Sequence, residues 1–318
     1  MHGALIIDKP ASMTSHDVVA RVRKIIGERR VGHTGTLDPF ATGVLVVLVG
    51  RATRLAQFLS GAEKEYEAVI RLGYATDTGD VRGKPLERPA NGFTAETQRT
   101  QGLRREEIEA ALAALRGEIE QTPPMYSARK IAGQKLYELA RRGEEIARKA
   151  VRITVSQFEI AAHDGPLLMR NDDGSHDLRV RVVCSAGTYV RALAESVGEL
   201  LGVGAHLTEL RRTRAGRFKI EEAITLDRLN DTAQSGSVEQ VLISPDAALA
   251  HLPFLNLDPA RAQRVRHGID VQIEATQTSD WPEGQPVRLR DANGGLIGVG
   301  VYDEARKLTH PKVVISTE

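Results

Sequence analysis

Apolar positions along the chain recur with the periods of strands and helices, and they predict the first elements. Residues 4–8 form a short apolar run that predicts a strand. Thr14 and Asp17 have the spacing of a helix capping box, and the apolar residues after them recur with the helical period, which predicts a helix. Residues 43–49 are continuously apolar and residues 64–72 alternate, so we expect one strand buried on both faces and one buried on a single face.

The same periods continue along the rest of the chain. They predict three further helices and three further strands, at residues 105–117, 133–142 and 188–201 and at residues 151–160, 178–184 and 215–220. Because strands and helices are mixed without strict alternation, we expect an α+β fold with a mixed, largely antiparallel sheet flanked by helices. Residues 286–301 have the pattern strand, turn, strand, with the turn at 291–295, which predicts a small β domain at the C-terminus.

Length and composition agree with a folded protein of two domains. The chain has 318 residues, of which 41% are hydrophobic and 27% charged. We expect one domain at residues 1–250 and a second at 251–318. Cys184 is the single cysteine, which excludes an intrachain disulfide and a cysteine-based zinc site. The sequence shows neither a signal peptide nor an apolar run of membrane-spanning length, so we expect a cytoplasmic protein without membrane contact.

The net charge of +1 hides an uneven distribution of basic residues. Lysines and arginines gather at residues 21–30, 121–149 and 206–220, whereas acidic residues gather at 104–120 and near the C-terminus. Any one such cluster can be an ordinary solvated face. Several of them, with the acids segregated elsewhere, favour a surface that binds a polyanion.

The segment GHTGTLDPFATG at residues 32–43 holds the densest group of residues suited to chemistry. Pro39 disfavours a helical conformation for Asp38, and the glycines and threonines around it suit a tight loop that could hold an exposed carboxylate. An aspartate that only caps a turn is the alternative. The segment lacks the spacing of a phosphate-binding loop. The nine histidines show no metal-ligand spacing, and no second carboxylate suggests a glycosidase.

This segment is similar to the catalytic motif of the TruB-type tRNA pseudouridine synthases. Three further stretches resemble that family in the same order: KEYEAVIRLG followed by TDTGD, PPMYSARKIAGQKLYELAR, and CSAGTYVRALAESVGELLG followed by AHLTELRRTRAG. Together they cover most of residues 3–229. The resemblance implies the pseudouridine synthase fold for residues 1–250, with an RNA-binding insertion at about 73–145.

The resemblance also implies roles for individual residues. Asp38 would be the catalytic nucleophile, Arg191 would pair with its carboxylate, and Tyr66 would stack on the target base and move a proton. His33 would fill the RNA gap that the flipped base leaves, Lys9 would line the same cleft and Leu207 would line the pocket. The alternatives are a core tyrosine for Tyr66 and an ordinary helix-surface arginine for Arg191.

Further candidates for substrate binding lie in the same motifs: Gly35, Thr36, Tyr189, Arg129 and Lys130. Arg141 and Arg142, in the basic cluster at 121–149, are candidates for contacts with RNA phosphates. For Tyr189 a core position is the favoured interpretation. Arg129 and Ile131, at the edge of the implied RNA contact, depart from the residues that many relatives carry there.

The C-terminal segment resembles a PUA domain, a small β-barrel found in RNA-modifying enzymes. The resemblance implies that Arg264, His267 and Gly268, together with the strand through Val299, contact the acceptor stem of tRNA. Residues 258–318 hold eight basic and nine acidic residues, which does not favour strong binding by this domain alone. We therefore expect it to position the RNA.

Taken together, the resemblance implies an isomerase that converts the T-loop uridine of tRNA, position 55, to pseudouridine. A base inside a folded loop must be flipped out of its stack before such a reaction. The reaction breaks the N1–C1′ bond and joins C5 to C1′ without a redox or hydrolytic step, so we expect no cofactor and no metal. We also expect a monomer that needs no protein partner. A non-catalytic RNA-folding module and a guide-RNA-dependent relative are the alternative hypotheses.

Overall fold

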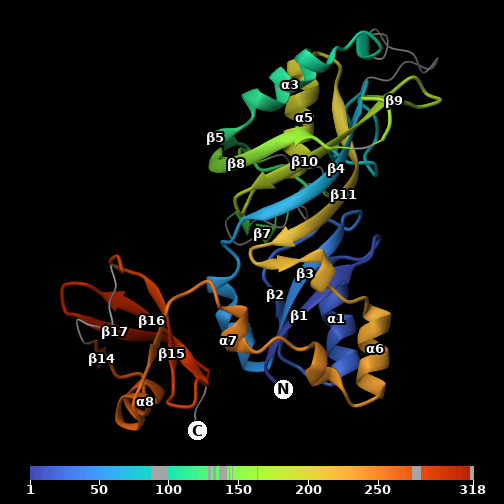
Figure 1. The fold of residues 1–318 in the computed structure, drawn as a ribbon. Coiled ribbons are helices and arrows are strands. Elements are labelled where there is room, and N and C mark those ends of the chain that lie inside the picture. Colours follow the sequence, from blue (N-terminus) through green and yellow to red (C-terminus); the bar gives the residue numbers. More distant parts are fainter. Residues whose placement is uncertain are drawn as a thin grey trace.

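The computed structural model describes residues 1–86, 99–127, 130–131, 134–135, 142, 144, 146–162, 164–273 and 281–315. These residues form two main sheets, a long one with helices on its faces and a smaller one near the C-terminus (Figure 1). No helix within the described part of the chain combines the length and apolarity needed to cross a membrane.

The long sheet has the order β1-β3-β11-β4-β10-β8-β5, and short strands pair at its edges. Its strands are β1 (Gly3–Lys9), β2 (Val31–His33), β3 (Thr42–Val49), β4 (Lys64–Leu72), β5 (Gly117–Gln121), β8 (Val151–Ile160), β9 (Met169–Arg170), β10 (His176–Cys184), β11 (Ala205–Ala215) and β12 (Phe218–Lys219). Neighbouring strands run antiparallel except for β3 and β11, which are parallel. The expected α+β fold with a largely antiparallel sheet is therefore confirmed.

Helices flank the two sheets, and α8 packs on the smaller one. They are α1 (Ser15–Ile26), η1 (Gly50–Phe58), α3 (Arg105–Ala114), α5 (Val190–Leu201), η2 (Ile220–Glu222), α6 (Leu226–Gln234), η3 (Val238–Val241), α7 (Pro245–Ala248) and α8 (Pro259–Arg266). The capping box expected at the start of α1 is present: the Thr14 hydroxyl accepts from the Asp17 backbone N–H at 3.0 Å, and the Thr14 backbone N–H donates to the Asp17 carboxylate at 2.8 Å.

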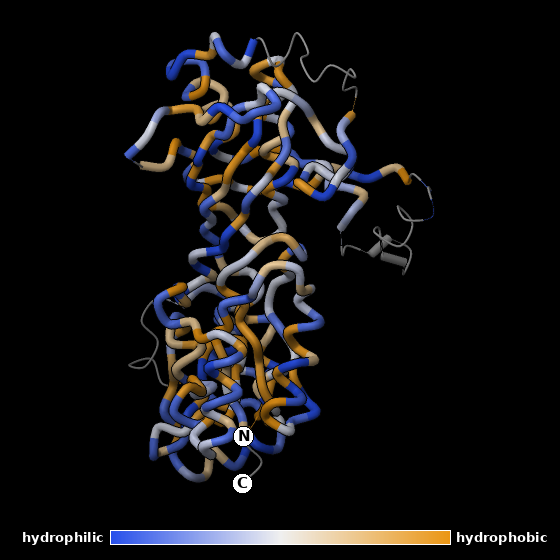
Figure 2. Tube along the Cα trace, turned by 90° about the vertical axis from the view of Figure 1, so that its right-hand side faces the viewer, coloured by the Kyte–Doolittle hydropathy of each residue, from blue (hydrophilic) through white to orange (hydrophobic). Residues whose placement is uncertain are grey.

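Strands β1 and β3 are buried on both faces, which explains their continuous apolar sequences. Alternate residues of the two strands, such as Leu5 and Val47, pack against α1 and α6. The residues between them, such as Ile6 and Val46, pack towards η1 and the smaller sheet. Figure 2 shows the hydrophobic strands running through the interior of this half of the molecule.

In the other half of the sheet, the helices of the described residues cover one face. Helices α3 and α5 pack on β4, β8 and β10 around a core that includes Phe158, Leu178 and Val197. The opposite face carries charged side chains, among them Glu65, which accepts from Arg181 at 2.9 Å. The alternating pattern of residues 64–72 follows from this one-sided burial.

The smaller sheet has the order β13-β15-β16-β17-β14. Its strands are β13 (Phe254–Asn256), β14 (Val271–Gln272), β15 (Pro286–Arg290), β16 (Leu296–Asp303) and β17 (Leu308–Val314). The hairpin expected at 286–301 is confirmed, with the Asp291 carboxylate accepting from the backbone of Asn293 and Gly295 in its turn. This curled sheet is PUA-like, as expected. A domain boundary at residues 250 and 251 stays a proposal.

Two of the predicted elements differ from the structure. The helix expected at 133–142 is wrong at residues 134–135, because Gln134–Lys135 form strand β7, which pairs with β6 (Lys130–Ile131); most of the remainder lies outside the described residues. The strand expected at 215–220 is reduced to β12, and the long strand β11 before it was missed. Charged residues dominate the exposed positions of β11, so in the sequence this strand has the pattern of a basic cluster instead of an alternation of apolar and polar residues.

Candidate active site

Asp38 lies in the loop between β2 and β3, where the two halves of the long sheet meet. Its neighbours in the loop are held by α1 and the segment before it. The Ser15 hydroxyl bonds both the N–H and the carbonyl of Leu37, at 2.9 and 3.2 Å. The Pro39 carbonyl accepts from the Ser12 backbone N–H at 2.8 Å. The loop is thus fixed on both sides of the aspartate, whose side chain is 32% exposed.

Arg191 comes from the first turn of α5 and meets Asp38 from the other side. Its Nε donates to Oδ2 of Asp38 at 2.8 Å, and its Nη2 lies 3.4 Å from Oδ1. The two groups are 153 residues apart in sequence. A two-pronged guanidinium contact of this kind fixes the orientation of a carboxylate. The Arg191 side chain is only 3% exposed, so the helix-surface interpretation is wrong.

The guanidinium of Arg191 is itself held by the backbone of two loops. Nη1 donates to the Thr78 carbonyl at 2.8 Å and Nη2 to the Tyr126 carbonyl at 2.7 Å. The start of α5 is fixed by the side chain of Gln121 on β5, which bonds the backbone N–H and carbonyl of Tyr189 at 2.8 and 3.1 Å. The arginine therefore has one orientation, with the carboxylate at its open side.

A cavity of about 320 Å³ opens beside this pair. Six of the residues singled out in the sequence line it: Gly35, Thr36, Asp38, Tyr66, Tyr189 and Arg191. Tyr189 is half-buried in the cavity wall, so the core position favoured for it is wrong. The cavity is open to solvent beside an exposed carboxylate, which is the arrangement that a nucleophile needs.

Tyr66 lies on β4 between the hydrophobic core and the cavity. Its side chain is part of the core cluster and 7% exposed, yet it also lines the cavity. Burial raises the pKa of the Tyr66 hydroxyl above its ordinary value, so this group stays protonated at neutral pH. The core interpretation and the active-site interpretation therefore both describe part of its environment.

His33 and Lys9 lie around the Asp38 loop without lining the cavity. Burial lowers the pKa of His33 to about 4, and its ring packs edge-on against His16. The Lys9 ammonium is fully buried and donates to three carbonyls, those of Pro10, Met13 and Pro39. Lys9 therefore supports the Asp38 loop through these hydrogen bonds. Its side chain does not line the cavity, which is contrary to the expectation from the sequence.

Leu207 also lies away from the cavity. It is fully buried in the core, whereas Leu210 on the same strand lines the cavity. The backbone N–H of Leu207 donates to the Gly79 carbonyl at 3.0 Å, next to the Thr78 carbonyl that holds Arg191. Its contribution is therefore to the loop that orients the arginine.

The remaining candidates lie in the partly described segment after residue 127. Arg129 and Arg141 lie outside the described residues, and only the backbone of Lys130 is described, in β6. The side chain of Arg142 is exposed and pairs with Glu144 at 2.9 Å. Their contacts with RNA stay predictions.

The smaller sheet places its candidates in two different environments. Arg264, His267 and Gly268 are exposed at the end of α8. Val299 is fully buried and packs in the cluster that joins the two sheets, so its side chain is not available to RNA.

Lys64 and Arg212 line the cavity but were not singled out in the sequence. Arg212 is 2% exposed and donates to the carbonyls of Val44 and Gly35, at 2.7 and 3.1 Å. Lys64 donates to the carbonyls of Ser60 and Ala62. Both fall within the quoted motifs, but only the fold shows that these cations are buried. No three His, Cys, Asp or Glu side chains of the described residues gather as a metal site requires.

Two solved structures have folds similar to that of this chain. A chain of the Cbf5-Nop10-Gar1 complex matches with a TM-score of 0.72 and 27% identity, over 99% of this chain and 85% of that one. A chain of an H/ACA RNP bound to a substrate RNA containing 2′-deoxyuridine matches with a TM-score of 0.71 and 25% identity, over 99% of this chain and 85% of that one. The large sheet and the PUA-like sheet together have the architecture of a pseudouridine synthase.

Sequence comparisons narrow this class to one family. Residues 23–190 match the TruB family pseudouridylate synthase N-terminal domain, 191–250 the tRNA pseudouridylate synthase B C-terminal domain, and 253–315 the C-terminal domain of pseudouridine synthase II TruB. The tRNA pseudouridine synthase B of Mycobacterium sp. (strain KMS) is 49% identical over 292 residues, 90% of this chain and 91% of the relative. That of Bacillus cytotoxicus is 43% identical over 274 residues, 86% and 85% of the two chains. The chain belongs to the TruB family of pseudouridylate synthases and is an isomerase.

Proposed function

We propose that this enzyme converts the uridine at position 55 in the T-loop of tRNA to pseudouridine, with Asp38 as the nucleophile. The observation that carries the proposal is the Asp38–Arg191 pair, fixed at 2.8 Å beside an open cavity of about 320 Å³. Relatives that are 43 to 49% identical over most of their length are tRNA pseudouridine synthases B, which supports tRNA as the substrate.

The reaction rearranges one nucleotide without loss of atoms. The N1–C1′ bond breaks, the base turns within the cavity, C5 bonds to C1′, and the proton on C5 leaves to a base while N1 gains one. Asp38 donates an electron pair to the reacting nucleotide as the N1–C1′ bond breaks, and the bond that it forms is broken again when C5 joins C1′. Arg191 holds the Asp38 carboxylate in one orientation. Tyr66 offers an aromatic wall for the turning base and a neutral hydroxyl for proton transfer.

The target base must leave its stack to reach the cavity, at a cost of a few kcal/mol. Stacking on Tyr66 offsets part of that cost. His33 stays neutral at pH 7 because burial lowers its pKa to about 4, and a neutral ring is suited to stacking where the base has left. The exposed end of α8, with Arg264 and His267, would hold the acceptor stem.

The test uses an unmodified tRNA transcript and the purified chain alone. We expect one pseudouridine per tRNA, at the T-loop position, when the product is mapped nucleotide by nucleotide. Conversion only in the presence of a guide RNA or added proteins would favour the guide-dependent alternative. Tight binding and faster tRNA folding without any pseudouridine would favour the RNA-folding module.

A further inference from the structure

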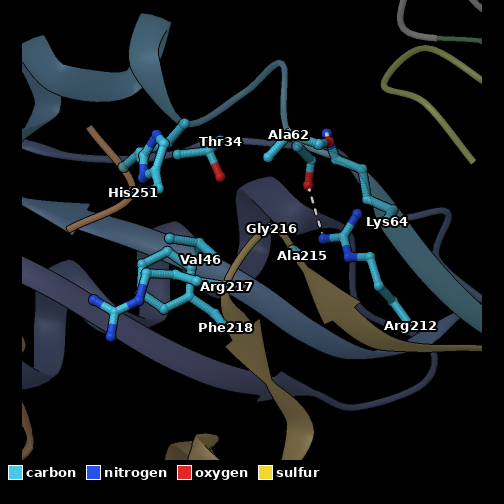
Figure 3. Close-up of a pocket in the computed structure, with 12 residues that line it drawn as sticks. Thr34, Val46, Ala62, Lys64, Arg212, Ala215, Gly216, Arg217, Phe218 and His251 are labelled. Carbon is cyan, nitrogen blue, oxygen red and sulfur yellow. Dashed lines mark hydrogen bonds between the residues drawn. The ribbon is translucent and has the colours of Figure 1, made fainter. Parts of the chain in front are cut away.

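A second, smaller cavity lies directly beside the catalytic one. It measures about 180 Å³ and shares four lining residues with the catalytic cavity: Thr34, Gly35, Lys64 and Arg212. In Figure 3, Lys64 and Arg212 lie at one side of it, and Arg217 and His251 lie at the other. We call this space the side cavity.

The ionisable groups in the described lining of the side cavity are all basic. Lys64, Arg212, Arg217 and His251 all contribute to its wall, and its described lining includes no Asp or Glu. Lys64 is 7% exposed and Arg212 2%. Lys64 and Arg212 each donate to two backbone carbonyls, and within the described part of the chain neither forms an ion pair with a carboxylate.

Two buried cations side by side are costly without an opposite charge. Burial and the neighbouring Arg212 together lower the pKa of Lys64 to about 8. An anion bound between Lys64 and Arg212 would reduce the repulsion between the two cations and raise the pKa of Lys64. The four carbonyl acceptors orient the cations, but carbonyl groups do not neutralise their charge.

The position of the side cavity indicates which anion it takes. The side cavity adjoins the catalytic cavity, so an RNA whose target uridine enters the catalytic cavity brings its backbone phosphates next to Lys64 and Arg212. We propose that Lys64 and Arg212 bind the RNA backbone phosphate adjoining the target nucleotide, with the phosphate seated in the side cavity. This inference rests on the proposed function, because it needs RNA in the catalytic cavity.

The competing interpretation is purely structural. Lys64 donates to the carbonyls of Ser60 and Ala62, which follow the end of η1, so it could serve only to hold that turn. The structural role predicts a loss of folding stability with no effect that depends on a particular phosphate of the RNA.

The test pairs a change in the protein with a change in the RNA. Binding of a T-arm RNA hairpin is measured by fluorescence anisotropy in an Asp38→Asn background, so that no RNA is converted. Lys64→Gln is compared with Lys219→Gln, a control on an exposed lysine of β12 that lines neither cavity. Each variant binds the normal hairpin and hairpins with one uncharged methylphosphonate, placed in turn at the phosphates on the 5′ and 3′ sides of the target. Thermal unfolding of each variant reports on folding separately.

We expect Lys64→Gln to weaken binding about 10- to 100-fold, the usual effect of one charge-assisted hydrogen bond. One of the two methylphosphonates weakens binding by a similar factor to the protein that keeps Lys64. Lys64→Gln and that methylphosphonate combined weaken binding no more than either change alone. The slope of log K against log salt falls by about 0.7 in Lys64→Gln and is unchanged in Lys219→Gln.

Two results would overturn the phosphate site. The first is that neither methylphosphonate weakens binding to the protein that keeps Lys64. This measurement does not depend on whether Lys64→Gln folds. The second is that the effects of the variant and of the methylphosphonate simply add. Failure of the proposed function is seen separately, as absence of pseudouridine from the tRNA transcript with the unaltered enzyme.

Discussion

Arg191 donates hydrogen bonds to Asp38 and to the carbonyls of Thr78 and Tyr126, which come from loops far apart in the sequence. The geometry uses the planar fork of the guanidinium, with different nitrogens serving different partners. A lysine would keep the charge but could not reach all of these acceptors at once.

We therefore predict that Arg191→Lys lowers kcat at least about 100-fold and costs about 1–3 kcal/mol of folding free energy. The matched control is Arg179→Lys, an exposed arginine on the opposite face of the sheet, which should change neither quantity by much. Steady-state kinetics and urea unfolding check the prediction. Wild-type kcat in Arg191→Lys would show that orientation of Asp38 by the fork is unimportant.

Lys9 gives a prediction for the dependence of stability on pH. Burial lowers its pKa from 10.5 to about 8, so between pH 8 and 10.5 the unfolded chain binds more protons at this residue than the folded one does. The contribution of Lys9 to the free energy of unfolding must then rise with pH across that window, by about 3 kcal/mol.

The measurement compares urea unfolding of the wild type and Lys9→Met at pH 7.5 and pH 10. The destabilisation caused by Lys9→Met should be larger at the higher pH. Lys24→Met, at an exposed lysine of α1, should show no such change. An effect of Lys9→Met that is equal at both pH values would mean that the folded-state pKa of Lys9 is not lowered.

The sequence indicated Asp38 and Arg191 as partners through the family motifs, and the structure brings them together. It did not indicate Lys64, Arg212 or Gln121. A buried cation that donates to backbone carbonyls, or a glutamine that fixes the start of a helix, leaves no periodic or spaced pattern. Such residues become visible only when segments far apart in the sequence are placed side by side.

At the scale of elements, strand β3 begins where the Asp38 loop ends, and Gly43 makes that start possible. Gly43 has a φ of +99°, and a Cβ there would lie 2.2 Å from the Arg212 carbonyl oxygen on the parallel neighbour β11. The close approach of the two strands at this point joins the two halves of the long sheet.

We predict that Gly43→Ala destabilises the protein by at least about 2 kcal/mol and lowers kcat by displacing the Asp38 loop. Gly27→Ala is the control, because Gly27 also has a positive φ of +68° but has nothing within 4 Å of the added Cβ. That change should cost about 1 kcal/mol and leave kcat unaltered. Similar costs at the two glycines would contradict the account of the strand junction.

Strands that are buried on both faces have continuous apolar runs, and strands that are buried on one face alternate, so both kinds can be predicted from sequence. Strand β3 was found from its continuous apolar run and β4 from its alternation. Strand β11 was missed because its exposed positions carry arginines that bond distant partners, such as Arg211 with Asp8 at 2.8 Å. Its strand conformation depends on pairing with β3 and β4, which are 133 or more residues earlier in the chain.

At the scale of the whole molecule, the smaller sheet is attached through Asp246 on α7. The Asp246 carboxylate accepts from Arg288 at 3.0 Å and from Arg290 at 2.7 Å, both on β15. Helix α7 lies against β1 of the long sheet, and Ala248 and Leu249 pack in the cluster that includes Val299. The junction therefore sets the direction in which the smaller sheet faces (Figure 1).

If that sheet positions the acceptor stem, Asp246→Asn should raise KM for whole tRNA about threefold to tenfold and leave KM for an isolated T-arm hairpin unchanged. Asp270→Asn is the control, because Asp270 pairs with His310 within the smaller sheet and not across the junction. An equal rise in KM for both RNAs would mean that Asp246 acts on folding or on the catalytic cavity instead.

Release of the uridine C5 proton tests whether Asp38 carries out the isomerisation. The tRNA transcript carries tritium at C5 of uridine and is incubated with the wild type or with Asp38→Asn, and tRNA binding by both is measured in parallel. We expect about one tritium released per tRNA with the wild type and none with Asp38→Asn, although the variant still binds tRNA. Release by Asp38→Asn at the wild-type rate would contradict this role of Asp38.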